Sequence, residues 1–231
     1  CRDCPRCRRR TGWILMKKEI LQGSSKTMGI EDLSVREFLD QTASSAPVPG
    51  GGSIAAVTAA SAAALIEMVI NLTIDKKGYE EVQGRMISMK SQLPSFRKLY
   101  LQAADADAAA FSSLMETLRR PKEEEGRAEA VQAAFKEAAE VPLTLGQDIF
   151  PLLTMARQVV EHGNIWAVTD GVIAAMNARA AMRAAFYSVR VNLQSINDGA
   201  YVYRTLSIIS DFENRADGQE RLIESLYKKR Q

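Results

Sequence analysis

The sequence predicts an all-α protein, a bundle of long and partly kinked helices. Alanine is abundant and aromatic residues make up 6% of the chain, a composition that favours closely packed helices over sheets. No run alternates apolar and polar residues for more than a few positions, so no strand is expected. The chain has 231 residues, of which 46% are hydrophobic, and this is enough for one domain with a buried core.

The N-terminal segment 1–30 is interpreted as a basic, disordered leader, outside a helical domain that spans 31–231. Residues 1–27 contain eight Lys or Arg and two acidic residues, which leaves 22 basic and 26 acidic residues elsewhere. The three cysteines also lie here and lack a fourth ligand at a suitable spacing for a metal. Because no apolar signal segment follows, a cytoplasmic protein that does not cross a membrane is expected.

Local signals define the first elements of the domain. Ser34 and Glu37 form a capping box, which predicts a helix over 35–43. The turn Pro47-Val-Pro-Gly-Gly-Gly-Ser53 cannot continue that helix, and an alanine-rich helix should run from the turn to about residue 72. This apolar helix is short for a membrane span and is predicted to be buried.

Prolines divide the longer helical stretches that follow. Pro94 should kink a helix or start a new one, and Pro142 and Pro151 should divide the next stretch into two or three pieces. The expected helical stretches end near residues 118, 160, 193 and 228.

One helix, over 165–193, carries small residues on a single stripe. They recur at intervals of three or four positions, so another backbone can approach them closely. Packing within the chain and a subunit interface of a dimeric bundle both fit this pattern. The stripe consists of Ala167, Gly171, Ala174, Ala178, Ala181 and Ala185.

The residue types of the domain limit its chemistry. Residues 31–231 contain no cysteine, and His162, at an expected helix end, is the only histidine of the chain. Cys-His and Ser-His-Asp catalysis are therefore excluded, and a metal site with His or Cys ligands is not expected. Carboxylates, lysines, hydroxyls, asparagines and backbone groups remain.

Two of the candidate features precede or occupy helices. The N–H groups of Gly50–Ser53 at a helix start suit a carboxylate or phosphate, although a plain N-cap loop fits as well. Asp105 and Asp107 are two apart on a helix and face different ways, so at most one points inward. A carboxyl group among alanines can have a raised pKa suited to acid–base work; a solvated helix face is the alternative.

Other candidates lie near helix ends. Asn164 is a plausible N-cap, and Asp170 follows about two turns later, one residue before the glycine of the stripe. Lys76 and Lys77 follow the alanine-rich helix, where cations are stabilised by the helix dipole. Beside an anionic ligand they would also serve as clamps.

Together these segments resemble the cyclodeaminase/cyclohydrolase family, which includes the C-terminal domain of formimidoyltransferase-cyclodeaminase and stand-alone relatives. The similar segments occur in the same order over about residues 30–210. They are Ser34-Val-Arg-Glu-Phe-Leu, Pro47-Val-Pro-Gly-Gly-Gly-Ser-Ile-Ala-Ala56, Asn71-Leu-Thr, Lys76-Lys77 before Tyr79, Asp107 before Ala-Ala-Ala-Phe111, Arg120-Pro-Lys, Ala139-Glu-Val-Pro-Leu143, Gly163-Asn164, Thr169-Asp170 and Val191-Asn-Leu193.

The resemblance implies an all-α homodimer that acts on one-carbon tetrahydrofolates without a metal or a tightly bound cofactor. Formimidoyltetrahydrofolate cyclodeaminase closes N10 onto the 5-formimino carbon and expels ammonia. Methenyltetrahydrofolate cyclohydrolase adds water to the methenyl carbon. Both reactions need proton transfer at a carbon between two nitrogens.

The resemblance also implies roles for individual residues. Asp107 and Asp170 match acidic positions and are the acid–base candidates. The implied substrate-binding residues are Gly50, Gly51, Gly52 and Ser53 at the turn, Lys76 and Lys77 near the anionic tail of the folate, and Asn164 and Asn192 for the pterin or for ordering the site.

The chain departs from the family pattern in places. Relatives commonly read Gly-Lys-Lys-Lys-Tyr where this chain has Asp75-Lys-Lys-Gly-Tyr79, and Trp166 replaces a small or polar residue. Arg190 enters a segment where it is not usual. A bulky Trp166 is expected to alter the choice of substrate.

Two other functions fit the sequence without catalysis. One is a dimeric helical protein that binds a folate-like anion or a protein partner. The other is a nucleic-acid contact by the basic leader, although the mildly acidic domain itself predicts no nucleic-acid partner.

Overall fold

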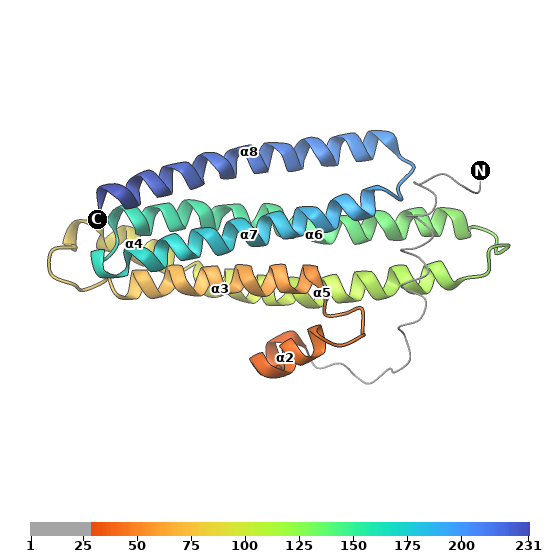
Figure 1. The fold of residues 1–231 in the computed structure, drawn as a ribbon, viewed down its shortest axis with the longest axis horizontal. Coiled ribbons are helices and arrows are strands. Elements are labelled where there is room, and N and C mark those ends of the chain that lie inside the picture. The colour runs from red at the N-terminus through yellow and green to blue at the C-terminus, as the bar shows by residue number, and fades with distance from the viewer. Residues whose placement is uncertain (1–28) are drawn as a thin grey trace.

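The computed structural model describes residues 29–231, and within this range the protein consists of helices joined by loops (Figure 1). Predictions about residues 1–28 lie outside the described part. In chain order the elements are η1 (Ile30–Asp32), α2 (Val35–Thr42), α3 (Gly51–Asn71), η2 (Glu80–Val82), α4 (Gln83–Lys90), α5 (Leu93–Arg119), α6 (Arg127–His162), η3 (Ile165–Ala167), α7 (Val168–Leu193) and α8 (Gly199–Lys229).

Four long helices form the bundle. α3 packs against α5 and α7, and α6 packs against the same two helices. α8 lies over α6 and α7 as an outer layer (Figure 1). Fully buried alanines of α3 and α7 allow the helices to approach closely, and large side chains such as Ile66, Leu152 and Phe186 fill the space between them.

Most predicted boundaries are confirmed. The Ser34 side chain accepts the N–H of Glu37, and the Glu37 carboxylate accepts the N–H of Ser34, so the capping box is present at the start of α2. α3 begins directly after Gly50, and α5 begins with a proline in its first turn, at Pro94. The expected interruption near Pro94 is therefore the short break between α4 and α5.

The predicted division of α6 is wrong, because α6 is one helix of 36 residues with Pro142 and Pro151 inside it. Pro142 has no N–H for the carbonyl of Ala138, four residues earlier. The Nδ2 of Asn192 donates to that carbonyl at 2.6 Å instead. A partner from α7 thus removes one of the costs of a proline within the helix.

The small-residue stripe of α7 packs inside the chain, so the structure does not support a subunit interface there. Its five alanines are at most 2% exposed. A Cβ atom on Gly171 would lie 2.9 Å from the Val160 side chain, which shows how closely α6 approaches.

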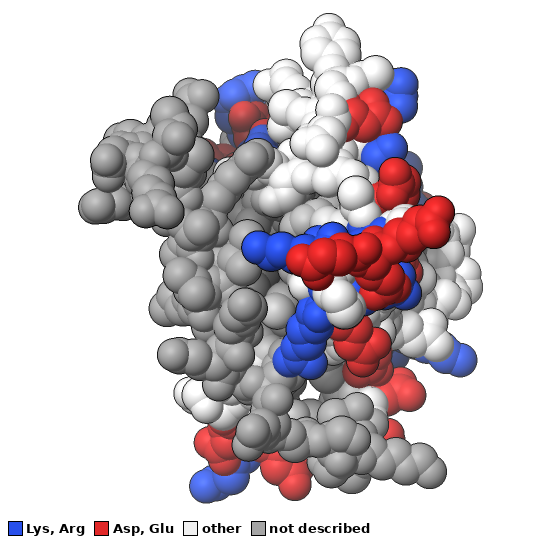
Figure 2. Space-filling view, turned by 90° about the vertical axis from the view of Figure 1, so that its right-hand side faces the viewer, with Lys and Arg blue, Asp and Glu red and all other residues white. Residues whose placement is uncertain are grey.

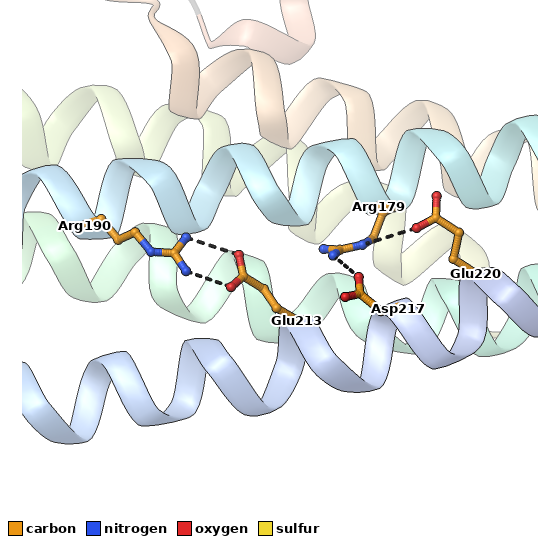
Figure 3. A network of polar contacts seen from close by, with 5 residues as sticks. All are labelled: Arg179, Arg190, Glu213, Asp217 and Glu220. Atoms are coloured by element: carbon orange, nitrogen blue, oxygen red, sulfur yellow. Dashed lines mark hydrogen bonds and ion pairs between the residues drawn. The ribbon is translucent and has the colours of Figure 1, made fainter.

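Arginines of α7 hold α8 in place (Figure 3). Arg190 donates to both carboxylate oxygens of Glu213, at 3.1 and 2.7 Å. Arg179, which is buried, pairs with Asp217 and lies 3.7 Å from the Glu220 carboxylate. Arg190, which departs from the family pattern, is therefore bound by a carboxylate of α8.

α3 is long and apolar enough to cross a membrane by length and composition, but 56% of its most apolar window is buried in the bundle. This burial and its packing on α5 and α7 are those of a core helix.

At the end of the bundle that carries the α5–α6 loop, basic and acidic side chains are interspersed among the described residues (Figure 2).

Candidate functional site

The glycine turn and Asp107 meet at the start of α3. The Asp107 carboxyl group, on α5, lies directly against the Cα of Gly52, where a Cβ atom would overlap it. Ser53 is fully buried, and its hydroxyl donates to the carbonyl of Ala104 at 3.1 Å. The Asp107 carboxyl group can therefore occupy this position only because residue 52 has no side chain.

Burial raises the pKa of the Asp107 carboxyl group, and the N–H of Ser53, which donates to it, lowers the pKa in part. This donor belongs to the first turn of α3, whose dipole also favours a negative charge. The anion that the turn binds within the chain is thus Asp107 itself. A half-buried carboxyl group with a raised pKa suits acid–base chemistry.

Asp105 does not share this position. Its Oδ1 accepts the N–H of Ile30 at 3.0 Å, so it holds the chain segment that enters from η1. Of the two carboxylates only Asp107 lies against the start of α3, which agrees with the expectation that at most one of them points inward. Both aspartates nevertheless accept backbone N–H groups from the same N-terminal part of the domain.

The loop after α3 presents Lys76 and Lys77, both exposed. Among the described residues, neither lysine has an ion-pair partner. Asp75 adopts a left-handed conformation with φ 58°, and Gln83 exchanges two hydrogen bonds of 3.0 Å with it. The loop therefore has a defined shape although its cations are solvated.

Asn164 joins this loop to the start of α7. Its Nδ2 donates to the carbonyl of Leu72 and its backbone N–H to the hydroxyl of Thr73, both at 2.8 Å. Its Oδ1 accepts the N–H of Trp166 at 3.1 Å, so it caps η3 as predicted. These hydrogen bonds use the amide group for ordering the turn, which was one of its two implied roles.

Asp170 lies in the first turn of α7, on the same side of the bundle as the lysine loop. Among the described residues its carboxylate has no hydrogen-bond or ion-pair partner. Trp166 is 86% exposed just before it.

His162 is the last residue of α6. Burial lowers the pKa of its imidazole and the carboxylate of Glu161 raises it, while three nearby arginines lower it further: Arg85, Arg230 and Arg157.

The predicted residues thus form two groups at opposite ends of α3. Gly50–Ser53 and Asp107 are at its N-terminus, whereas Lys76, Lys77, Asn164 and Asp170 are at its C-terminus. A helix of 21 residues is about 30 Å long. Asn192 belongs to neither group, because its amide supports α6 at Ala138.

Two supporting residues were not singled out from the sequence. The Tyr79 hydroxyl accepts the N–H of Ile165 at 2.9 Å, which ties the lysine loop to η3. Arg230, near the end of α8, donates to the carbonyls of Val160 and Gly163 at 2.7 and 2.8 Å. Neither contact has a local sequence signal, because the partners are 86 and 67 to 70 residues apart.

Residues 29–231 bring no three His, Cys, Asp or Glu side chains together in an arrangement able to hold a metal ion. Asp107 and Asp170, the two carboxylates of interest, stand at different ends of α3. What the arrangement offers chemically is one carboxyl group of raised pKa at a helix N-terminus, and a separate group of solvated cations with a carboxylate.

The sequence profile of the formiminotransferase-cyclodeaminase family matches residues 34–211, which include the glycine turn, Asp107 and Asp170. The chain belongs to this family. The resemblance seen in the ordered sequence segments is thereby confirmed.

Two stand-alone proteins match this family member over nearly their whole length. The methenyltetrahydrofolate cyclohydrolase of Methylorubrum extorquens is 34% identical over 201 residues, which cover 85% of this chain and 97% of the relative. The crystal structure of a formiminotetrahydrofolate cyclodeaminase from Thermotoga maritima superposes with a TM-score of 0.80 at 31% identity, covering 86% and 98% of the two chains.

Longer relatives match the family member over only part of their length. The formimidoyltransferase-cyclodeaminase of Gallus gallus is 29% identical over 216 residues, which are 92% of this chain but 40% of the relative. The chain therefore spans about two fifths of such relatives, and the resemblance assigns it to their C-terminal, cyclodeaminase part.

Proposed function

We propose that the protein is a folate-dependent one-carbon enzyme, with methenyltetrahydrofolate cyclohydrolase as the leading activity. The support is the match to a stand-alone cyclohydrolase over 97% of its length, together with the carboxyl group held against Gly52 at the start of α3. The similar fold of a stand-alone cyclodeaminase favours formimidoyltetrahydrofolate cyclodeaminase as the second candidate.

The proposed chemistry uses Asp107 for proton transfer. In cyclohydrolysis, water adds to the cationic methenyl carbon while the carboxylate takes one of its protons. The bond from that carbon to N5 then breaks, N5 takes the proton held by Asp107, and the added hydroxyl group releases its proton to solvent as the C=O bond forms, which gives 10-formyltetrahydrofolate. In cyclodeamination N10 attacks the 5-formimino carbon and gives up its proton, and the formimino nitrogen gains two protons and leaves as ammonia, which gives the methenyl cation.

The cyclohydrolase is tested by the decay of methenyltetrahydrofolate absorbance, since the methenyl bridge is the chromophore. We expect decay well above the uncatalysed rate, in the absence of added metal. Formation of the same absorbance from 5-formiminotetrahydrofolate would identify the cyclodeaminase. A protein that binds the folate but accelerates neither reaction would be a non-catalytic binder, and the proposal would be wrong.

We also propose that the active form is a homodimer through the outer faces of α3 and α7. These neighbouring helices expose an unpaired apolar face with few charges, as dimer interfaces do. Its members include Met68, Leu72, Ile173, Met176 and Tyr187, which are 38–60% exposed. The length of α3 and the width of two helices give roughly 600 Å², close to the ~800 Å² per partner of a standard interface.

A two-fold dimer with antiparallel α3 helices would unite the two groups of site residues. It places the α3 N-terminus of one chain, with Asp107, against the α3 C-terminus of the other, with Lys76, Lys77 and Asp170. The folate would then be held at its reacting carbon by one chain and at its anionic tail by the partner. This accounts for site residues that lie about 30 Å apart within one chain.

Mixing two inactive variants tests the shared site. In a shared site, Asp107→Asn and Asp170→Asn should each inactivate both sites of their own homodimer. After unfolding and refolding together, half of the dimers are mixed, and each contains one intact site of its two. We expect about a quarter of the wild-type activity, measured by methenyl absorbance decay; no recovery would show that each site lies within one chain.

A further inference from the structure

Among residues 29–231, α2 is the helix that packs least against the other elements. It makes few contacts with the bundle and projects from its side (Figure 1). Phe38 is its one buried residue, whereas Val35 is 77% and Leu39 is 52% exposed. These apolar side chains are four residues apart and lie on one face of the helix, so the face lacks a partner within residues 29–231.

α2 is nevertheless anchored at both of its ends beside Asp107. Before it, the N–H of Ile30 donates to Asp105 at 3.0 Å. After it, the chain passes through Pro47–Gly50 into the start of α3, where Gly52 lies against Asp107. The capping box gives the helix its own start. An ordered helix with a fixed base, and with an apolar face that residues 29–231 leave uncovered, is suited to pack against another apolar surface.

A matching groove lies on the other half of α3. It has a volume of about 340 Å³ and is lined by Ala64, Glu67, Met68, Asn71, Leu72 and Arg97. Met68 and Leu72 are 38% and 48% exposed, and the ion pair of Glu67 with Arg97 forms its edge on the side of α5. The floor is apolar and the edge is polar, which suits the apolar face of an amphipathic helix.

Within one chain, α2 cannot fill this groove, because α2 is tied to the N-terminal end of α3 and the groove lies near the C-terminal end. In the antiparallel pairing proposed above, the α3 helix of the partner runs in the opposite direction. It brings the partner's groove opposite the α2 of the first chain, and the two-fold symmetry repeats the contact. The groove is also continuous with the apolar face that the dimer would cover, at Met68 and Leu72.

We infer that α2 is an arm that packs Val35 and Leu39 into the groove around Met68 and Leu72 of a second copy of this chain. The arm adds its own apolar side chains to the roughly 600 Å² that α3 and α7 supply, toward the ~800 Å² per partner of a standard interface. Because its base adjoins Asp107, the arm also fixes the glycine turn against the partner. The inference rests on the homodimer of the proposed function and identifies the element that locks it.

The first test replaces the apolar face of the arm. In Val35→Asp/Leu39→Asp the dimer should dissociate at least about a hundredfold more readily, because two apolar side chains per arm lose their cover. Sedimentation at a series of concentrations measures the dissociation constant. Tyr203→Asp, at a position of α8 that is 76% exposed, is the control and should leave that constant unchanged.

A double-mutant cycle locates the contact. Leu39→Ala and Met68→Ala should each weaken the dimer, and the double variant should lose less than the product of the two separate losses. Hydrogen exchange of the α2 amides should slow when wild-type protein passes from monomer to dimer. Thermal melts establish that each variant folds. We expect this because the side chains of Val35, Leu39 and Met68 are all exposed.

The outcomes separate the arm from the dimer. A stable dimer whose α2 amides exchange as fast as in the monomer, or whose affinity survives Val35→Asp/Leu39→Asp, would overturn the arm and leave the homodimer intact. Slow exchange of α2 in the monomer would show that α2 packs on its own chain. A wild-type protein that stays monomeric at all concentrations would overturn both.

Discussion

Gly52→Ala should reduce kcat/KM by at least about a hundredfold, although it adds only one methyl group. A Cβ atom at this position would overlap the Asp107 carboxyl group. The carboxyl group must then leave the N–H of Ser53 and the start of α3. Displacing a reacting group by about 1 Å can itself cost about a hundredfold in rate.

Gly51→Ala is the matched control for this change. Gly51 lies one residue earlier in the same helical turn and is exposed, and a Cβ atom added to it would meet nothing within 4 Å. Alanine is also a better helix former than glycine by up to about 1 kcal/mol. The substrate-binding role implied for the turn uses backbone N–H groups, which alanine keeps, so we expect Gly51→Ala to keep its activity and to melt at the same temperature or slightly higher.

The comparison of the two variants separates catalysis from folding. Both are measured by methenyl absorbance decay, and thermal melts followed by circular dichroism show whether each is folded at the assay temperature. Equal activity of folded Gly52→Ala and Gly51→Ala would mean that the place of the Asp107 carboxyl group has no bearing on the reaction.

The helices themselves could be predicted well, because their ends depend on local chemistry. The capping box at Ser34 and Glu37, the glycine turn before α3 and the proline at the start of α5 all act within a few residues. The continuity of α6 could not be predicted in this way. It is supported by Asn192, 54 residues from Ala138, whose amide donates to the Ala138 carbonyl that the missing N–H of Pro142 cannot reach.

The sequence proposes a set of candidate site residues but not how they are arranged in space. Spacing alone left the glycine turn and Asp107 with ordinary alternatives, and the ordered family segments selected both. Their contact depends on how α3 and α5 lie against each other, because Gly52 and Asp107 are far apart in the chain. The same holds for the separation of Asp107 from Lys76 and Asp170, which is fixed by the length and direction of α3.

The small-residue stripe shows a further limit of sequence patterns. Close approach of two backbones is needed equally within a chain and between chains, so Gly171 and its neighbouring alanines fit both. The structure buries them inside the chain, with the Val160 side chain of α6 over Gly171. The face that we propose for a second copy is the adjacent one, with Ile173 and Met176, which are 41% and 60% exposed.

Asp107→Asn should remove the reaction while leaving the fold at least as stable at pH 7. Loss of a general acid or base costs about a hundredfold to ten-thousandfold in rate. The amide has nearly the shape of the carboxylate, and its oxygen can still accept the N–H of Ser53. The variant therefore changes the proton chemistry and keeps the contacts with Gly52.

The pKa shift gives this variant a distinct dependence of stability on pH. Burial raises the pKa of the Asp107 carboxyl group above its ordinary value, so the folded state holds this proton more tightly than the unfolded state does. The resulting stabilisation is complete below the unfolded pKa, about 4, and is lost as pH rises through the folded pKa. At pH 7 the wild type therefore buries a charge that the asparagine variant does not.

Thermal melts of both proteins between pH 4 and 7 measure this effect. Relative to the wild type, Asp107→Asn should gain stability as pH rises, and the pH dependence of kcat/KM should identify the same group. In the wild type kcat/KM should fall on the acid side, as the carboxylate that accepts the proton of water is neutralised. Parallel stability profiles of wild type and variant would show that the pKa of Asp107 is not raised in the folded state. An active Asp107→Asn would exclude this carboxyl group as the base and direct the search to Asp170.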